Sequence, residues 1–293
     1  MRTAESSDYH LSDDENAQIF YDQIVPDLLE DIPSQHTPTL SVVVGQHGAG
    51  KTYLTDTLIK PELHERGEYI DIDTDVYKRY HPAYEELMAK DDKTMAIHTG
   101  LDGQRWMLRA YMYAREHRKN TLTQETVQNP PFLADMIKTY REDEFRVEVS
   151  AMAVSEAVSR QGVIKRYHDQ VAMNGSGRLP PPEKIRASLN GILEFATITD
   201  EKMIADSVSV FCRNSLLPSY SNTIVNGTWR QTPRFREAIE EGRAYPLDDD
   251  EATNFLLTHE QLMGSLGKEW EFELCAISSL AEYILRSPTE MEA

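Results

Sequence analysis

Residues 39–52 read Thr-Leu-Ser-Val-Val-Val-Gly-Gln-His-Gly-Ala-Gly-Lys-Thr, an apolar run that passes directly into a glycine-rich stretch. The apolar residues 39–44 predict a buried β-strand, and residues 52–66 predict a helix. The segment between them, residues 45–52, matches the pattern G-x-x-x-x-G-K-[ST] in full. This order of strand, glycine-rich turn and helix is the structural context that a phosphate-binding loop (P-loop) requires.

The residue types of the loop explain how it would hold phosphate. Glycines allow a tight turn in which consecutive N–H groups point inward, and the helix that follows presents its positive N-terminal end to the same anion. Lys51 can reach β- and γ-phosphates, and the Thr52 hydroxyl can bind Mg²⁺. The residues expected to bind the nucleotide are Gly45, Gln46, His47, Gly48, Ala49, Gly50, Lys51, Thr52 and Tyr53.

The rest of the chain predicts strands alternating with helices, hence an α/β fold with a mainly parallel sheet flanked by helices. Ser12 and Glu15 form a candidate capping box for an N-terminal helix, which Pro26 should kink or divide. We expect an N-terminal helical segment (1–38), a P-loop kinase-like core (39–232) and an acidic helical C-terminal appendage (233–293). The other expected strands are 68–72, 121–125, 146–154 and 206–212. The expected helices are 12–31, 83–119 with a break near 100–103, one from Pro130-Pro131 to about 140, 155–173, 183–195 and a helical region from about 233.

The charge of the chain excludes some partners. Of 293 residues, 30 are Lys or Arg and 49 are Asp or Glu, so the net charge is −19. Residues 1–40 contribute −8 and residues 237–293 contribute −11, which leaves the middle of the chain neutral. The acidic balance and the lack of basic clusters argue against nucleic-acid and membrane binding. The N-terminus has no apolar signal region and there are two cysteines, so we expect a cytoplasmic protein with reduced thiols.

A P-loop alone does not distinguish switches, motors and kinases. The chain has no N-K-x-D element for guanine and no clear apolar strand that ends in Asp-Glu, since Glu148 lies inside its strand. A small-molecule kinase needs a carboxylate at the end of a neighbouring strand, and Asp71, Asp73 and Asp75 follow the second strand. The alternative interpretation of these acids is a helix N-cap cluster.

With these residues in view, the chain resembles the zeta toxins, the P-loop kinases of epsilon/zeta toxin–antitoxin systems. Residues 73–82 are similar to the family's D-x-D…H-P segment, and the loop is similar to G-Q-P-G-[AS]-G-K-[ST], with His47 in place of the proline. The resemblance covers about residues 12–215. The matching positions, in chain order, are 45–52, Asp73, Asp75, His81, Pro82, Glu125, Thr126, Met152-Ala153-Val154, Arg166-Tyr167 and Arg178.

The resemblance implies a reaction and a role for each residue. The family transfers the γ-phosphate of ATP or GTP to the sugar 3′-hydroxyl of UDP-N-acetylglucosamine, which inhibits cell-wall synthesis. Asp75 would act as the base, and Arg166 and Arg178 would join Lys51 in stabilising the transferred phosphoryl group. Asp75, His81, Glu125 and Thr126 would contact the nucleotide sugar, and a small helical antitoxin would be the partner.

Several alternatives remain open at this point. Gln124 could occupy the position assigned to Glu125, since Glu125-Thr126 lacks the glycine of the family's E-G-T element. Arg166 could form a surface ion pair with Asp169 or Glu156. The acceptor could be an antibiotic, a nucleoside or NAD, or the protein could be a nucleotide-binding interaction module without catalysis.

Overall fold

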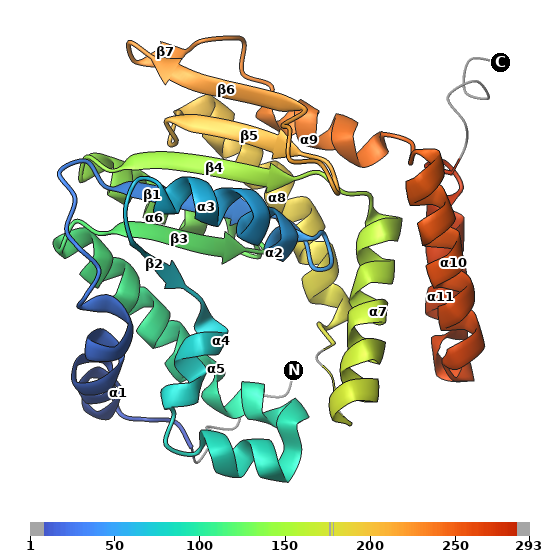
Figure 1. Cartoon of the computed structure of the whole chain (residues 1–293), viewed down its shortest axis with the longest axis horizontal. Coiled ribbons are helices and arrows are strands. Elements are labelled where there is room, and N and C mark those ends of the chain that lie inside the picture. The colour runs from blue at the N-terminus through green and yellow to red at the C-terminus, as the bar shows by residue number, and fades with distance from the viewer. Residues whose placement is uncertain (1–8, 176, 178, 286–293) are drawn as a thin grey trace.

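The strand before the glycine-rich stretch, β1 (Thr39–Val44), lies in the middle of a seven-stranded sheet (Figure 1). This arrangement is seen in the computed structural model, which describes residues 9–175, 177 and 179–285. The strand order is β2-β3-β1-β4-β5-β6-β7; the first five are parallel and the last two are antiparallel. The mainly parallel α/β fold is therefore confirmed. The other strands are β2 (Tyr69–Ile72), β3 (Asn120–Glu125), β4 (Arg146–Met152), β5 (Ser207–Phe211), β6 (Tyr220–Val225) and β7 (Thr228–Trp229).

The register of the parallel strands brings their carboxyl ends to one edge of the sheet. Val44 pairs with Glu125 of β3 on one side and with Ala151 of β4 on the other. Ile72 of β2 pairs with Thr123, so the acids after β2 emerge beside the end of β3. Ligands of open α/β sheets bind at this edge, which here collects the segments after β1, β2 and β3.

Helices cover both faces of the sheet (Figure 1). Leu40, Val42 and Val44 belong to a buried cluster on one face, with residues of η1, α5, α6, α8 and α9, whereas Val43 belongs to a second cluster on the other face, with α2, η2, α3 and α7. The all-apolar β1 is thus explained, because a strand covered on both faces has no solvent-exposed side. The helices are α1 (Asp13–Ile19), η1 (Phe20–Leu29), α2 (Lys51–Leu54), η2 (Thr55–Ile59), α3 (Lys60–His64), α4 (Thr74–Tyr77), η3 (Lys78–Tyr80), α5 (Tyr84–Glu116), α6 (Pro130–Glu142), α7 (Glu156–Asn174), α8 (Pro182–Lys202), α9 (Phe235–Ala244), α10 (Asp249–Ser265), η4 (Lys268–Trp270) and α11 (Glu271–Ala281).

The N-terminal helix begins as predicted. The Ser12 hydroxyl accepts a hydrogen bond from the Glu15 N–H, and the Glu15 carboxylate accepts one from the Ser12 N–H. The α-helix ends at Ile19 and continues as the π-type helix η1, which contains Pro26 and runs to Leu29. The change of helix type precedes the proline, and the helix does not end at it. A wider turn accommodates the proline ring, which would contact the carbonyl four residues earlier in an α-helix.

One prediction about the elements was wrong, and one pair of strands was missed. Helix α5 runs without a break from Tyr84 to Glu116, and Gly103 lies within it. A Cβ at Gly103 would lie 3.0 Å from Lys78 Cγ and 3.1 Å from Thr74 Cγ2, so this glycine permits the close approach of α4 instead of ending the helix. The hairpin of β6 and β7, which extends the sheet at its edge, was not predicted.

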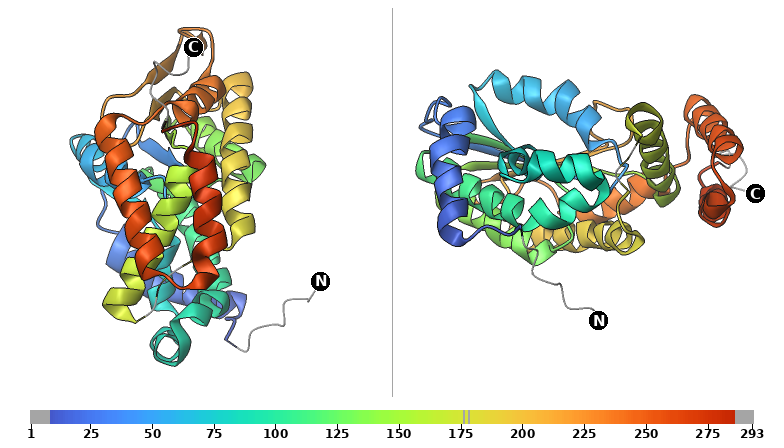
Figure 2. Two further views of the ribbon diagram at one scale, coloured as in Figure 1. Left: turned by 90° about the vertical axis from the view of Figure 1, so that its right-hand side faces the viewer. Right: turned by 90° about the horizontal axis from the view of Figure 1, so that it is seen from below.

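The C-terminal region is helical, as expected, but its parts pack on different layers. Phe235, Ala238 and Ile239 of α9 join the buried cluster that contains η1 and α5. Helices α10 and α11 form a hairpin that lies beside α7, outside the sheet (Figure 2). In the described part of the chain, no helix has the length and apolar character needed to cross a membrane.

Candidate active site

The P-loop follows β1 without interruption and leads into α2, as predicted. Gly48 and Gly50 have φ angles of +76° and +89°, a region in which side chains other than glycine are strained. Lys51 Nζ donates a hydrogen bond to the Gly45 carbonyl at 2.6 Å and to the Gln46 carbonyl at 3.3 Å. Thr52 and Tyr53, the next two residues of α2, are exposed.

The environment of Lys51 changes its acid–base behaviour. Burial lowers the pKa of Lys51, the Glu125 carboxylate opposes this shift and the Arg166 guanidinium adds to it, and the combined effect places the pKa at about 8. The ammonium group therefore loses its proton closer to neutral pH than an ordinary lysine does. Glu125 and Arg166 therefore both lie close enough to Lys51 to influence its charge.

Glu125 ends β3 next to the start of the P-loop. Its carbonyl accepts a hydrogen bond from the Gly45 N–H at 3.1 Å, and its carboxylate accepts one from the Tyr111 hydroxyl at 3.2 Å. Burial raises the pKa of Glu125, while Tyr111 and Lys51 oppose the increase. The carboxylate that influences Lys51 thus belongs to Glu125, which favours Glu125 over Gln124. Thr126 lies next to it, and its hydroxyl accepts a hydrogen bond from Gln128 Nε2 at 3.2 Å.

The three acids in and after β2 have different surroundings, since Asp71 lies within the strand and Asp73 and Asp75 follow it. Asp73 is the N-cap of α4, because its carboxylate accepts a hydrogen bond from the Asp75 N–H at 2.8 Å. Asp71 pairs with Lys60 at 3.0 Å. Asp75 lies in the first turn of α4, where its carboxylate contacts Lys78 Nζ at 2.8 Å. The N-cap interpretation therefore holds for Asp73, and Asp75 is the acid whose carboxylate is held by a buried lysine.

Helix α7 lies directly against the P-loop. A Cβ at Gly48 would be 2.1 Å from the Ser159 carbonyl oxygen, and a Cβ at Gly162 would be 3.0 Å from the Gly48 carbonyl oxygen. Arg166 lies one turn after Gly162 on this helix. The acids considered as partners for Arg166 pair with other cations, Asp169 with Lys165 at 2.6 Å and Glu156 with Arg160 at 3.1 Å. Arg178, the second expected arginine, lies outside the described residues.

The two histidines of the expected site have different surroundings. His81 is 3% exposed; its Nε2 donates a hydrogen bond to the Tyr9 carbonyl at 3.0 Å, and its Nδ1 accepts one from the Ala83 N–H at 3.2 Å. The ring also stands edge-on to Trp106. His81 is therefore packed between α5 and the segment before α1, and this placement does not support the contact with substrate that was expected. His47 is half-buried within the P-loop.

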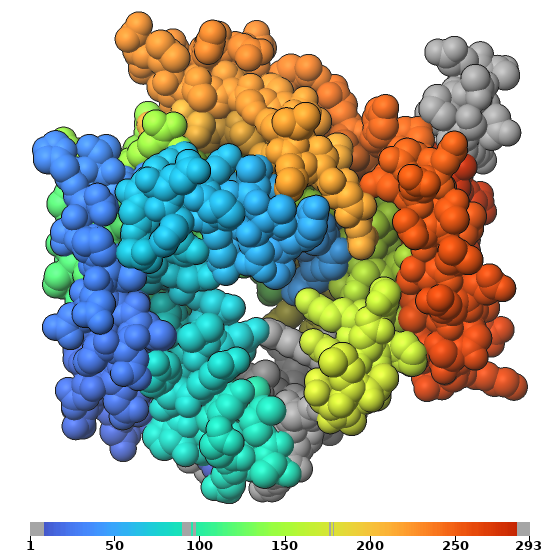
Figure 3. Space-filling view, in the orientation of Figure 1, coloured from blue at the N-terminus to red at the C-terminus, as the bar shows by residue number. Residues whose placement is uncertain are grey.

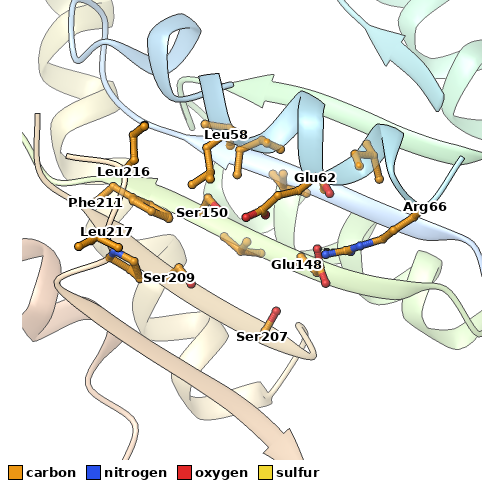
Figure 4. A pocket seen from close by; sticks show the side chains of 17 residues that line it. Leu58, Glu62, Arg66, Glu148, Ser150, Ser207, Ser209, Phe211, Leu216 and Leu217 are labelled. Atoms are coloured by element: carbon orange, nitrogen blue, oxygen red, sulfur yellow. Dashed lines mark hydrogen bonds and ion pairs between the residues drawn. The ribbon is translucent and has the colours of Figure 1, made fainter. Parts of the chain in front are cut away.

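The surface is hollowed where these segments meet. Figure 3 shows the hollow between α2, the α4–α5 segment and α7. A separate cavity of about 420 Å³ lies over the middle of β4 and β5, beside α3 (Figure 4). Ser150 and Ser209 line it from the strands and Glu62 from α3, and none of the predicted site residues takes part. The cavity is thus distinct from the candidate active site.

Sequence reasoning missed two groups that contact the site. Tyr111 lies near the C-terminal end of α5, where nothing in the local pattern separates it from other core aromatics. Arg243 of α9 donates a hydrogen bond to the Gln46 side chain at 3.2 Å across 197 positions of sequence. No short motif can reveal a contact between residues so far apart, because only the fold brings them together.

Comparisons with known proteins agree with this geometry. The family model described as Zeta toxin matches residues 26–224 of the 293. A solved structure from the PezAT chromosomal toxin–antitoxin system of Streptococcus pneumoniae is similar over 87% of this chain and 97% of its own, with a TM-score of 0.70 and 18% identity. The AvrRxo1-ORF1:-ORF2 structure with ATP is similar over 92% of this chain and 88% of its own, with a TM-score of 0.55 and 13% identity. Among curated proteins, no sequence matches the chain significantly. At these identities the solved structures show a shared fold.

Proposed function

The chain belongs to the zeta toxin family, and on that premise we propose that it transfers the γ-phosphate of ATP or GTP to the 3′-hydroxyl of UDP-N-acetylglucosamine or a related nucleotide sugar. The observation that supports this most is the meeting of P-loop and acceptor-side groups at one edge of the sheet. Glu125 is hydrogen-bonded to Gly45 through its backbone, and its carboxylate acts on the partly buried Lys51.

In this proposal each group acts on a particular atom. The Asp75 carboxylate takes the proton of the acceptor hydroxyl as its oxygen bonds to the γ-phosphorus and the bond to the leaving nucleoside diphosphate breaks. Lys51, Arg166 and Arg178 bind the phosphoryl oxygens, whose negative charge must be stabilised from several sides. Glu125 and Thr126 contact the nucleotide sugar. Lys78 orients the carboxylate of Asp75 through the contact at 2.8 Å.

The residues present also fit a magnesium ion. Within the described ranges, no three His, Cys, Asp or Glu side chains form a group that could hold a metal. Mg²⁺ commonly takes few protein ligands and relies on substrate phosphates and water for the rest. The exposed Thr52 hydroxyl, next to Lys51, suits this arrangement. When bound with the nucleotide, the ion would neutralise phosphate charge.

The central experiment incubates the protein with ATP and Mg²⁺ and a panel of nucleotide sugars, with mass spectrometry as the readout. The panel also contains an aminoglycoside, nucleosides and NAD. A phosphorylated nucleotide sugar supports the proposal. Phosphorylation of another compound would support the proposed kinase activity but contradict the proposed acceptor. Binding of ATP without any product would contradict the proposal and favour a non-catalytic nucleotide-binding module.

We also propose that the protein acts with a small helical antitoxin. The solved relatives come from a toxin–antitoxin system and from an AvrRxo1-ORF1:-ORF2 complex. Co-expression with the product of a small neighbouring gene should abolish toxicity and yield a complex that co-purifies. Toxicity that persists in the presence of every neighbouring small protein would contradict this part of the proposal.

A further inference from the structure

The side chain of Gln46, the second residue of the P-loop, is fully buried. Its Nε2 donates a hydrogen bond to the Val154 carbonyl at 2.5 Å, and its Oε1 accepts one from Arg243 Nη2 at 3.2 Å. Arg243 Nη1 donates to the Leu189 carbonyl at 2.9 Å. The amide of Gln46 is therefore fixed between the segment after β4 and helix α9, and α9 is in turn tied to α8.

The position of Arg243 is unusual among the arginines of α9 and its flank. Arg234 and Arg236 lie near the surface and pair with Glu241 and Glu240. Arg243 is largely removed from water, which lowers its pKa to about 10, although Glu240 and Glu156 raise it. Among the described residues its Nε is buried without a hydrogen-bond partner. Burying a guanidinium is unfavourable unless hydrogen bonds compensate for the lost hydration. Here the hydrogen bonds are made to the Leu189 carbonyl and to the Gln46 amide.

The backbone next to Arg243 is shaped for this approach. A Cβ at Gly242 would lie 2.6 Å from the Ala153 Cβ, so the glycine lets α9 come against the segment after β4. Ala153 precedes Val154, the residue whose carbonyl holds Gln46. Gly242 and Arg243 thus lie where α9 packs against Ala153 and Val154, the segment that holds the Gln46 side chain.

The peptide at Gln46 matters for the phosphate-binding geometry. Its carbonyl and that of Gly45 are the acceptors for Lys51 Nζ. Rotation of this peptide would move both the lysine and the N–H groups that face the anion. Preorganised donors bind phosphate more tightly than donors that must first be ordered.

We propose that Arg243 is a positioning residue that holds Gln46 and thereby keeps the P-loop in its phosphate-binding conformation. Helix α9, expected as part of an appendage, would then be a component of the nucleotide site. The effect of Arg243 on nucleotide affinity rests on the proposed function, whereas its effect on loop order does not.

The test compares Arg243→Met, Arg243→Lys, Gln46→Met and the double variant Arg243→Met/Gln46→Met in the full chain. Arg234→Met is the matched control, because Arg234 is half-exposed and pairs with Glu241 away from the loop. The first readout is hydrogen exchange of peptides spanning residues 45–52 in the nucleotide-free protein. The second is the affinity for ATP with Mg²⁺, measured by calorimetry, together with the KM for ATP and kcat.

We expect faster exchange in residues 45–52 of Arg243→Met and Gln46→Met, and ATP affinity weakened by about tenfold, the effect of losing one charge-assisted hydrogen bond. The KM for ATP should rise more than kcat falls. The double variant should be no weaker than the single variants, because both remove the same contact. Arg243→Lys should restore part of the affinity.

Other outcomes would overturn the proposal. One is that hydrogen exchange in the loop and ATP affinity are the same in Arg243→Met as in Arg234→Met. Another is that the effects of Arg243→Met and Gln46→Met add in the double variant. The third is that exchange rises uniformly over the whole chain. If Arg243→Met does not fold, Gln46→Met and Arg243→Lys decide by the same criteria. If the unchanged protein binds no nucleotide, the proposed function fails, and the exchange data still decide the role of Arg243.

Discussion

Lys51 combines an expected position with an acid–base behaviour that no motif predicts. Because its pKa lies at about 8, the free protein loses the ammonium charge as the pH rises through that value. A bound triphosphate favours the charged form, so nucleotide binding takes up a proton above this pH. We therefore expect ATP affinity to be constant below about pH 8 and to fall by up to tenfold per pH unit above it, as calorimetry between about pH 7 and pH 9.5 would measure.

Two variants control this pH dependence. In Lys51→Arg the guanidinium stays charged, so any remaining affinity should not change over the same range. In Glu125→Gln the loss of affinity should begin at lower pH, since the Glu125 carboxylate raises the pKa of Lys51. An affinity in the unchanged protein that is flat up to pH 9.5 would refute the assignment.

Substitution of Asp75 can distinguish an effect on phosphoryl transfer from an effect on ATP binding. Its carboxylate is half-exposed and held by Lys78 at 2.8 Å, which leaves it accessible to an acceptor hydroxyl. Asp75→Asn should lower the rate of phosphoryl transfer by about 10²–10⁴-fold, the usual contribution of a general base, with little change in ATP affinity. Product formation by mass spectrometry and ATP binding by calorimetry would measure the two effects.

Asp71→Asn is the matched control for Asp75. It removes a carboxylate from β2 that pairs with Lys60, and the transfer rate should change by less than about twofold because exposed ion pairs contribute little. Equal losses in the two variants would show that the acidic segment acts through its overall charge and not through one base.

Sequence patterns predicted the positions of single residues in the fold better than their surroundings. The P-loop pattern located Lys51, and the order of motifs located Glu125, because these depend on residue types at fixed spacing. His81 matched its motif equally well and yet is buried against Trp106. Burial depends on α5 and on the segment before α1, which the motif does not contain.

At the scale of elements, the contact between the P-loop and α7 decides where Arg166 lies. Gly48 has a positive φ and touches the Ser159 backbone, so Gly48→Ala meets both backbone strain and a clash. We expect a loss of about 2–5 kcal/mol in the free energy of unfolding in urea, or a displaced α7 with loss of phosphoryl transfer.

Gly175→Ala separates these two causes. Gly175 also has a positive φ, at the end of α7, but a Cβ there would meet nothing within 4 Å. Its substitution should lower the free energy of unfolding by only about 1–2 kcal/mol and leave transfer intact. If both variants lose the same stability and both stay active, the contact with α7 does not position the site.

The elements were predicted where periodicity was strong and missed where it was not. Strands β1 to β5 and most helices follow from apolar runs of the right length. The β6–β7 hairpin escaped prediction because the polar residues Ser221-Asn222-Thr223 interrupt the apolar residues of β6, and β7 has two residues. Gly103 was misinterpreted as a helix end because packing against α4, not local preference, explains the glycine.

At the scale of the whole molecule, charge and packing divide the chain differently. The net charge of −19 lies in the two flanks, which suggested that residues 233–293 form a separate appendage. In the structure α9 joins one buried cluster, and α10 and α11 join the other together with Met152 and Val158. A surplus of surface charge marks where a segment meets solvent and does not reveal what its apolar side is packed against.

This packing predicts that the C-terminal hairpin unfolds together with the core. Ile277 of α11 is fully buried in the cluster that includes α7 and the end of β4. Ile277→Ala should lower the free energy of unfolding by about 2–5 kcal/mol, as expected for a truncated core side chain. Because one cluster connects hairpin and sheet, the whole chain should lose this stability in a single transition with an unchanged urea dependence.

Tryptophans in different layers provide the measurement. Trp270 of η4 reports on the hairpin, and Trp106, fully buried in α5, reports on the core. Urea unfolding is followed by fluorescence in Trp229→Phe/Trp270→Phe and Trp106→Phe/Trp229→Phe backgrounds, each of which keeps one tryptophan. Ile277→Ala should lower the free energy of unfolding by the same amount in both. Ser279→Ala, an exposed change on the same helix, should leave both curves in place. An early transition confined to Trp270, with that of Trp106 unaffected, would show that the hairpin is an independent unit and that the core does not depend on it.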